Sequence, residues 1–295
     1  MFQNINENTI NREEYVESKS EKKKIDLFTN VLQIKNVPIY IISLMIAMVG
    51  ITGDISPFSV SILGACIVNS IPLLGVVLFS SIGSCIKFGI SGLLEYILTA
   101  LVLIITMFII KPRYNDDEKN EKIRLSKNIF IATMIIELAK VGMAGFTLYD
   151  ILSIISFSII AVVFYKIFVN SVVVIRDFSD KKAFSIEEIL GASLILAIAV
   201  GAFGNFSIFG FSLRNILSIL IVLILGWKNG VLVGTTAGVT IGVTLGVITS
   251  SDPIMVAAYA ISGMVAGVLN RFGKLGVIIG FCLGNVVLAY VSNGY

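Results

Sequence analysis

Long apolar runs, separated by short polar or charged segments, follow a polar N-terminal arm at residues 1–36. An α-helix needs about 20 mainly apolar residues to cross the hydrocarbon core of a bilayer, and most runs approach that length. We count eleven runs, at 37–53, 56–69, 71–88, 90–110, 128–147, 149–175, 188–204, 212–227, 229–250, 253–270 and 274–292. The second and third are short and adjoin at Pro72, so one long bent helix is an alternative there. The pattern predicts an all-α polytopic membrane protein with about 10–11 transmembrane helices.

Glycine recurs at every fourth position in the ninth run, at Gly230, Gly234, Gly238, Gly242 and Gly246. Each interior glycine costs about 1 kcal/mol in a water-exposed helix. In a membrane, where the backbone must satisfy its own hydrogen bonds, glycines four apart instead leave a strip of bare backbone against which another helix packs closely.

The last two apolar runs continue the same spacing. The further glycines are Gly263, Gly267, Gly276, Gly280 and Gly284. We interpret all ten as helix-packing residues and expect the last three runs to form a tight bundle. A substrate cavity lined by glycine backbone is the alternative.

The distribution of charge predicts an orientation. Only 14% of the residues are charged and 56% are hydrophobic, with a mean hydropathy of +0.95, whereas soluble domains carry about 25% charged residues. Basic residues cluster in the N-terminal arm and in the segments near 111–127, 176–182 and 271–274. Even numbers of runs separate these clusters, so all fall on one side, which the positive-inside rule makes cytoplasmic. Lys87 and Arg214 fall on the opposite side, and eleven crossings would place Tyr295 outside the cell.

Four charged residues lie inside apolar runs, away from the run ends, at Glu95, Glu137, Lys140 and Lys166. Charges within membrane helices are expensive and are often functional. Glu137 and Lys140 are three residues apart, so they share a helix face and are expected to pair, while Lys166 is placed to extend toward the interface. A neutralised pair that stabilises the bundle is favoured, and an ion or substrate path through Glu95 and Glu137 is the alternative.

Two local patterns concern the second half of the chain. Ser185 and Glu188 have the spacing of a capping box before the seventh run. The segment 49–56 resembles 200–207, which suggests a parallel internal repeat with halves 37–175 and 185–295, as in duplicated transport folds. Chance similarity among abundant small residues is the alternative.

The sequence offers no pattern of soluble catalysis. It has no histidine, which excludes a Ser-His-Asp triad and a Cys/His zinc site. Cys66, Cys85 and Cys282 are isolated in apolar runs and are interpreted as packing residues. No basic stripe with interleaved aromatic residues indicates nucleic-acid binding. We predict no catalytic, metal-binding or cofactor-binding residue in this chain, and no cleaved signal peptide before the first run.

Motifs in the second half carry a family resemblance. They are Ser185–Ile189, the glycine-rich run that ends at Thr249, Tyr259–Gly267 and Phe272–Asn285. Their order, after a charged arm, four runs, a basic loop and two runs, resembles the N-terminal membrane region of the stage II sporulation protein E family.

This resemblance implies a location and a role. In that family the membrane region anchors a segment that engages the cell-division machinery and a PP2C-type serine/threonine phosphatase, which uses Mn or Mg, and the whole protein acts at the asymmetric septum to activate a forespore sigma factor. Neither the segment nor the phosphatase is expected in this chain, which we interpret as an N-terminal portion.

The expected function is membrane anchoring, localisation and homo-oligomerisation in the bacterial plasma membrane, with lipid as the surrounding partner. The alternatives are a transporter or substrate-binding membrane subunit, and a sensor with a ligand near Asp54 and Asn205.

Overall fold

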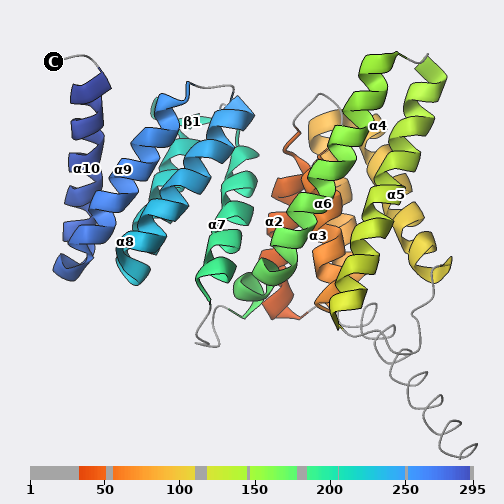
Figure 1. Cartoon of the computed structure of the whole chain (residues 1–295), viewed down its shortest axis with the longest axis horizontal. Helices are drawn as coiled ribbons and strands as arrows, with labels where there is room; N and C mark the ends of the chain where they lie inside the picture. The colour runs from red at the N-terminus through yellow and green to blue at the C-terminus, as the bar shows by residue number, and fades with distance from the viewer. Residues whose placement is uncertain are drawn as a thin grey trace, which may run out of the picture.

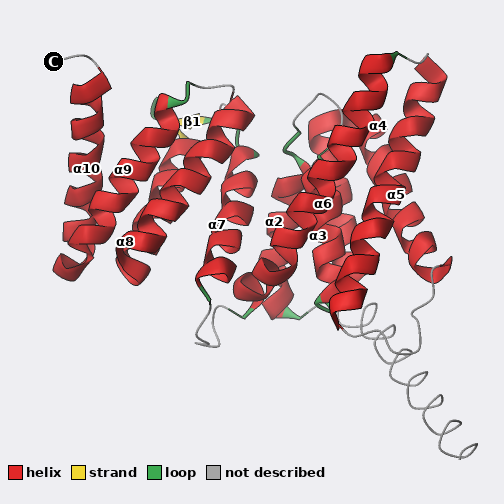
Figure 2. Ribbon diagram, viewed as in Figure 1, coloured by secondary structure: helices red, strands yellow, loops and turns green. Residues whose placement is uncertain are grey.

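The computed structural model describes residues 33–50, 56–109, 118–144, 147–177, 185–204, 206–249 and 252–292, and these are almost entirely helical (Figures 1 and 2). The helices are η1 (Ile34–Asn36), α2 (Val37–Ala47), α3 (Pro57–Val68), α4 (Leu73–Ile109), α5 (Glu118–Ala144), α6 (Leu148–Arg176), α7 (Ile186–Gly201), α8 (Leu213–Thr249), α9 (Ile254–Val268), η3 (Leu269–Phe272) and α10 (Gly273–Ser292). A two-residue antiparallel hairpin, β1 (Ser207–Ile208) and β2 (Phe211–Ser212), joins α7 to α8.

Two of the longest helices fold back on themselves at a glycine. Gly89 in α4 and Gly230 in α8 have φ of 73° and 79° with ψ of −160°, a region that is essentially restricted to glycine. A Cβ added to Gly234 would lie 3.1 Å from the Cα of Gly226, although residues eight apart in a continuous helix are separated by about 12 Å. Each helix is therefore a hairpin of two limbs, 73–88 and 90–109 in α4 and 213–229 and 231–249 in α8.

The predicted fold class is confirmed. With these two reversals, the nine α-helices of the described residues form eleven helical segments, which follow the eleven predicted runs. The alternative of one bent helix across Pro72 is wrong, because α3 ends at Val68 and α4 begins at Leu73.

Length decides which helices can cross a membrane unaided. Four described stretches are long and apolar enough by length and composition, at Leu73–Ile109, Leu148–Arg176, Leu213–Val247 and Ile254–Ser292. The first, third and fourth each contain a reversal, at Gly89, Gly230 and Gly273, so among these four only α6 is one continuous helix. The helices α2 and α3 have only 11 and 12 residues, fewer than the roughly 17 that the hydrocarbon core requires. The number of crossings stays a prediction.

Two hydrophobic cores meet at α7. The first core lies among α2 to α7 and is filled by large side chains such as Leu63 and Phe168. The second lies among α7 to α10 and includes Val222 and Phe281. Figure 1 shows α8, α9 and α10 as one group and α2 to α6 as another, with α7 between them. Helix α7 contributes Ile195 to the first core and Ala197 to the second, so it joins the two groups through opposite faces.

Side-chain hydrogen bonds fix the register of α3 on α6. Ser61 donates to the Ala161 carbonyl at 2.7 Å, and Asn69 donates to the Val169 carbonyl at 2.7 Å. Both pairs are 100 residues apart, so the two helices run parallel. Arg176 completes the junction by donating to the Asn69 carbonyl at 3.1 Å.

Capping boxes begin α6 and α7. In the predicted box, the Glu188 amide donates to the Ser185 hydroxyl at 3.2 Å and the Ser185 amide donates to the Glu188 carboxylate at 2.8 Å, so this prediction is confirmed. Thr147 and Asp150 form a second box at the start of α6.

The helix ends divide between two ends of the molecule. The start of α2, the end of α4, the start of α5, the end of α6 and the start of α7 lie together at what we call the basic end (Figure 1). Lys87, beside the Gly89 reversal, and Arg214, at the start of α8, lie at the opposite end, as the run count predicted. The proposed internal repeat lies partly outside the described residues, since 51–55 and 205 belong to it.

Candidate functional site

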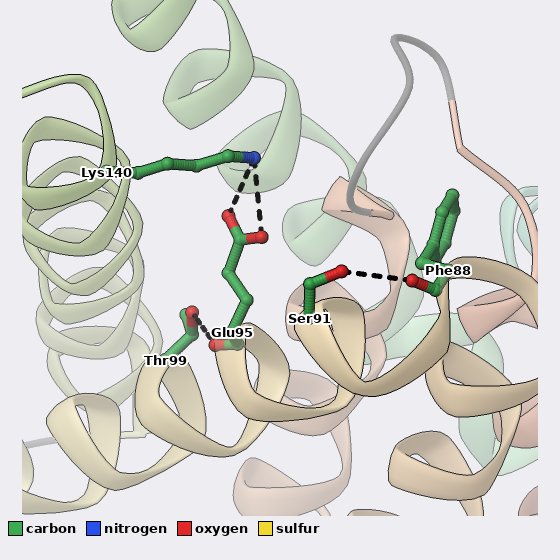
Figure 3. Close-up of polar contacts among 5 residues, drawn as sticks. All are labelled: Phe88, Ser91, Glu95, Thr99 and Lys140. Carbon is green, nitrogen blue, oxygen red and sulfur yellow. Dashed lines mark hydrogen bonds and ion pairs between the residues drawn. The ribbon is translucent and has the colours of Figure 1, made fainter. Parts of the chain in front are cut away.

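A charged contact joins the second limb of α4 to α5. The Lys140 ammonium lies 3.3 Å from both carboxylate oxygens of Glu95 (Figure 3). The Lys140 side chain is 39% exposed and the Glu95 side chain is 11% exposed. Neutralisation lowers the cost of placing either charge among apolar helices, so this contact ties the two helices together without leaving a net charge.

The local turns around Glu95 are held by hydroxyl groups. Thr99 donates to the Glu95 carbonyl at 2.8 Å, and Ser91 donates to the Phe88 carbonyl at 3.1 Å (Figure 3). These bonds anchor the helix that begins after the Gly89 reversal. Glu95 therefore projects toward α5 from an ordered turn next to the hairpin tip.

The other two intramembrane charges are placed differently. Glu137 lies half-buried one turn before Lys140 on α5, and its expected pairing with Lys140 stays a prediction. Lys166 is exposed on the outer face of α6, where its stem can follow the apolar surface while the ammonium reaches polar surroundings. Sequence spacing identified the charged residues, but it did not identify Glu95 of α4 as the partner of Lys140.

The glycine row of α8 lies against α9. A Cβ added to Gly234 would lie 2.6 Å from the Gly263 carbonyl oxygen, and one added to Gly242 would lie 2.8 Å from the Val256 Cα. A Cβ added to Gly238 would likewise collide with the Tyr259 carbonyl oxygen. The second limb of α8 and α9 are therefore in backbone contact along this row.

Two members of the row behave differently. Gly230 forms the reversal and lies beside Gly267, whose added Cβ would be 2.7 Å from the Gly230 carbonyl oxygen. A Cβ added to Gly246 would make only an ordinary van der Waals contact, because its nearest neighbour would be a Val256 methyl at 3.9 Å. Close packing thus ends one turn before the end of the row.

The glycines of α10 lie against α9 and the turn that follows it. Added Cβ atoms on Gly280 and Gly284 would lie 2.7 Å from the Val265 carbonyl oxygen and 2.6 Å from the Ser262 Cα. Gly276 packs against the Leu269 carbonyl oxygen at 2.5 Å. These glycine faces are filled within the chain, so any association between copies through them would require the bundle to open.

An apolar groove lies on the surface between the first limb of α8 and α10. It has a volume of about 490 Å³ and is lined by side chains that include Ile219, Leu223, Phe281, Cys282 and Asn285. Asn285 is exposed there. An amide on an otherwise apolar helix face is costly in lipid unless it finds a hydrogen-bonding partner. The Asn285 side chain therefore gives this apolar groove an outward-facing polar group.

The outer helix faces are apolar. On α10, Leu275 is 73% exposed, Ile279 is 56% exposed and Val286 is 64% exposed. On α4, Ile86 and Ile90 are 62% and 74% exposed. A water-soluble protein rarely leaves such continuous apolar surface uncovered, and a lipid bilayer is the environment that solvates it.

The described residues contain no group of three or more His, Cys, Asp or Glu side chains that could hold a metal ion. Cys66 is buried and Cys282 is exposed. The predicted ligand positions of the sensor alternative, Asp54 and Asn205, lie outside the described residues.

Comparison with known proteins gives a family. No curated protein and no solved structure matches the chain. The family model described as "SpoIIE, N-terminal domain" matches residues 2–294, and no match to a phosphatase domain was found in these residues. Since the match covers essentially the whole of this multi-pass helical membrane protein, the chain belongs to the SpoIIE N-terminal domain family.

Proposed function

We propose that this chain anchors and assembles a sporulation phosphatase of the SpoIIE type in the bacterial plasma membrane. The family match over residues 2–294 is the observation that carries the proposal, and the apolar outer faces of α4 and α10 support it. Anchoring needs only the helices and the lipid that surrounds them. Its N-terminal arm lies in the cytoplasm, and the whole protein gathers at the asymmetric septum. The phosphatase, its metal ions and the contacts with the division machinery belong to sequence outside this chain.

Self-association is assigned to the groove between α8 and α10. The glycine faces are occupied within the chain, whereas Asn285 and Cys282 line an open groove. An interhelical amide hydrogen bond in a membrane contributes about 0.6–2 kcal/mol, which helps a second copy of α10 to compete with lipid for this surface. A homo-oligomer in which α10 of one copy packs against the same groove of another satisfies the exposed amide.

Cysteine cross-linking in native membranes tests the assembly. In a chain that keeps Cys282 and carries Ala at Cys66 and Cys85, mild oxidation is expected to produce a covalent dimer. Asn285→Leu is expected to reduce the dimer several-fold by removing the amide pair. Asn229→Leu, which removes an exposed amide near the Gly230 reversal, is the matched control and is expected to cross-link normally.

A fluorescent fusion tests localisation independently. Fused to the arm at residue 1, the chain is expected to accumulate at asymmetric septa of sporulating cells. A uniform membrane signal would contradict the septal role, and absence of the Cys282 dimer with septal accumulation intact would contradict only the assembly through α10. The transporter alternative is not favoured by the family match.

A further inference from the structure

Arg214 is a half-buried basic residue whose Nε lacks a hydrogen-bond partner among the described residues. It lies in the first turn of α8, at the end of the molecule opposite the basic end. Its Nε is buried and makes no hydrogen bond, and no ion pair to Arg214 occurs in the part of the chain that the structure describes. A buried guanidinium N–H without an acceptor is costly among apolar helices, which indicates that an acceptor group accompanies it in the membrane.

The packing of α8 on α9 brings Arg214 above two further polar side chains. An added Cβ on Gly263 would lie 3.0 Å from a Val222 methyl, and one on Gly226 would lie 3.7 Å from the Gly267 amide nitrogen. Both pairs are 41 residues apart, so the first limb of α8 runs parallel to α9 in a fixed register. The same register places Ser218 level with Tyr259 and Arg214 one turn nearer the end.

The interactions of Tyr259 agree with this placement. Ser218 and Arg214 both contribute to the electrostatic surroundings of the Tyr259 hydroxyl. Tyr259 is 7% exposed and Ser218 is fully buried. A small polar cluster of Arg214, Ser218 and Tyr259, which we call the Arg214 cluster, therefore lies where α8 meets α9, with Ser218 and Tyr259 buried and Arg214 half-buried.

Several hydroxyls around this cluster lack hydrogen-bond partners. The Ser218 and Ser262 hydroxyls are fully buried and unpartnered, and the Ser212 hydroxyl just before α8 is also buried and unpartnered. Buried hydroxyls nearly always have a partner in folded proteins. Water would satisfy the hydroxyls but would leave the Arg214 charge unbalanced, whereas an oxyanion with several acceptor oxygens satisfies both.

The N-terminus of α8 also favours the binding of an anion. The first amides of a helix carry partial positive charge and point toward an anion bound at its N-terminus. Asp252, which precedes α9, is exposed and makes no ion pair with Arg214 in the described residues. No acidic side chain of the described chain therefore takes the place of a bound anion.

We propose that the Arg214 cluster binds a phosphate group, with the Arg214 guanidinium and the Ser212 and Ser218 hydroxyls as donors. The phosphate belongs either to an anionic phospholipid headgroup or to a soluble phosphate. The site is separate from the Asn285 groove and from the glycine contacts between α8 and α9, so it goes beyond anchoring and assembly and makes this end of the domain responsive to a ligand.

Thermal unfolding of the full chain in a phosphate-free detergent tests the proposal, with Trp227 as the single tryptophan probe. One series of measurements adds inorganic phosphate and the other adds phosphatidylglycerol. Each series is compared with potassium chloride at equal ionic strength. Binding to the folded state raises the apparent Tm, and a rise of about 2–4 °C is expected. A response to phosphatidylglycerol alone identifies the lipid headgroup as the source, and a response to phosphate identifies a soluble ligand.

Three variants separate the site from general charge effects. Arg214→Gln and Ser218→Ala are each expected to lose the rise in Tm. Lys87→Gln, which removes an exposed basic charge at the same end, is expected to keep it. Ser218→Ala carries the test if Arg214→Gln does not fold. The proposal is overturned if neither additive raises the Tm above the chloride control, or if the response survives in both cluster variants.

Discussion

Gly234 of α8 lies directly against Gly263 of α9, so that a single methyl group on Gly234 would come within 2.6 Å of the Gly263 carbonyl oxygen. The contact is reciprocal, because a Cβ on Gly263 would collide with the Gly234 carbonyl. Both obstacles are backbone atoms, which cannot move aside as a flexible side chain can. This pair therefore sets how closely the two helices approach.

The first prediction compares two members of the same glycine row. Gly234→Ala is expected to destabilise the domain by about 1–3 kcal/mol, because it overpacks a backbone contact. Gly246→Ala has 3.9 Å to its nearest neighbour and is expected to be neutral or stabilising by up to about 1 kcal/mol, since alanine is the better helix former. Unfolding of both variants in mixed detergent measures the difference. Equal stabilities would mean that the α8–α9 contact is not as close as described.

The second prediction concerns the reversal at Gly230. Its φ of 79° and ψ of −160° are strained for any residue with a Cβ, so Gly230→Ala is expected to lose about 1–3 kcal/mol of stability. Gly226→Ala is the control on the same helix, because a methyl there would meet its neighbours at an ordinary 3.7 Å. Protease sensitivity and apparent Tm provide the measurement, and a tolerant Gly230 would indicate a continuous α8 instead of a hairpin.

The third prediction is a coupling between Glu95 and Lys140. Glu95→Gln and Lys140→Met are each expected to destabilise the domain by about 1.5–3 kcal/mol, since each leaves a charged hydrogen-bonding group without its partner. The double variant is expected to lose less than the sum of the two. Lys166→Met, which removes an exposed lysine from α6, is expected to change stability little. Strictly additive losses would show that the two side chains do not pair in the membrane.

The fourth prediction concerns topology. The ends of α4 at Ile109 and α6 at Arg176 lie at the basic end, whereas the ends of α5 at Ala144 and α7 at Gly201 lie at the opposite end. Reporters fused after Ile109 and Arg176 are expected to give the signal of a cytoplasmic location. Reporters fused after Ala144 and Gly201 are expected to give the signal of a location on the opposite side of the membrane. A pair from the same end that reports from different sides of the membrane would contradict the helical arrangement.

The hairpin tips show what a closer reading of the sequence could have found. Lys87-Phe88-Gly89 and Arg271-Phe272-Gly273 share a basic-Phe-Gly pattern, and each is followed by a further glycine three residues on. Gly273 has φ of 71° and ψ of −159°, nearly the angles of Gly89. The predicted boundaries between runs fell at these positions because the apolar pattern is interrupted there, but periodicity alone does not reveal that the chain reverses with one particular backbone geometry.

The pairing of Glu95 with Lys140 marks the limit of spacing arguments. Residues three apart on one helix predicted a contact between Glu137 and Lys140, which stays a prediction. The contact between Lys140 and Glu95 joins residues 45 positions apart, which spacing within one helix does not reveal. The glycine rows show the same limit, since their spacing identified a helix face without identifying the helix that covers it. The Arg214 cluster was visible in the sequence only as one basic residue on the unexpected side.

The sequence by itself determined that this protein is a bundle of membrane helices, where the apolar segments begin and end, and that Ser185 caps a helix. Those properties depend on nearby residues, because lipid forces each apolar segment to satisfy its own backbone hydrogen bonds. Only the tertiary structure decided that α9 lies between the glycine faces of α8 and α10, that Glu95 meets Lys140, and that Arg214 lies above Ser218 and Tyr259. Spacing along a helix specifies a face, but its partner depends on how all the helices fill space together.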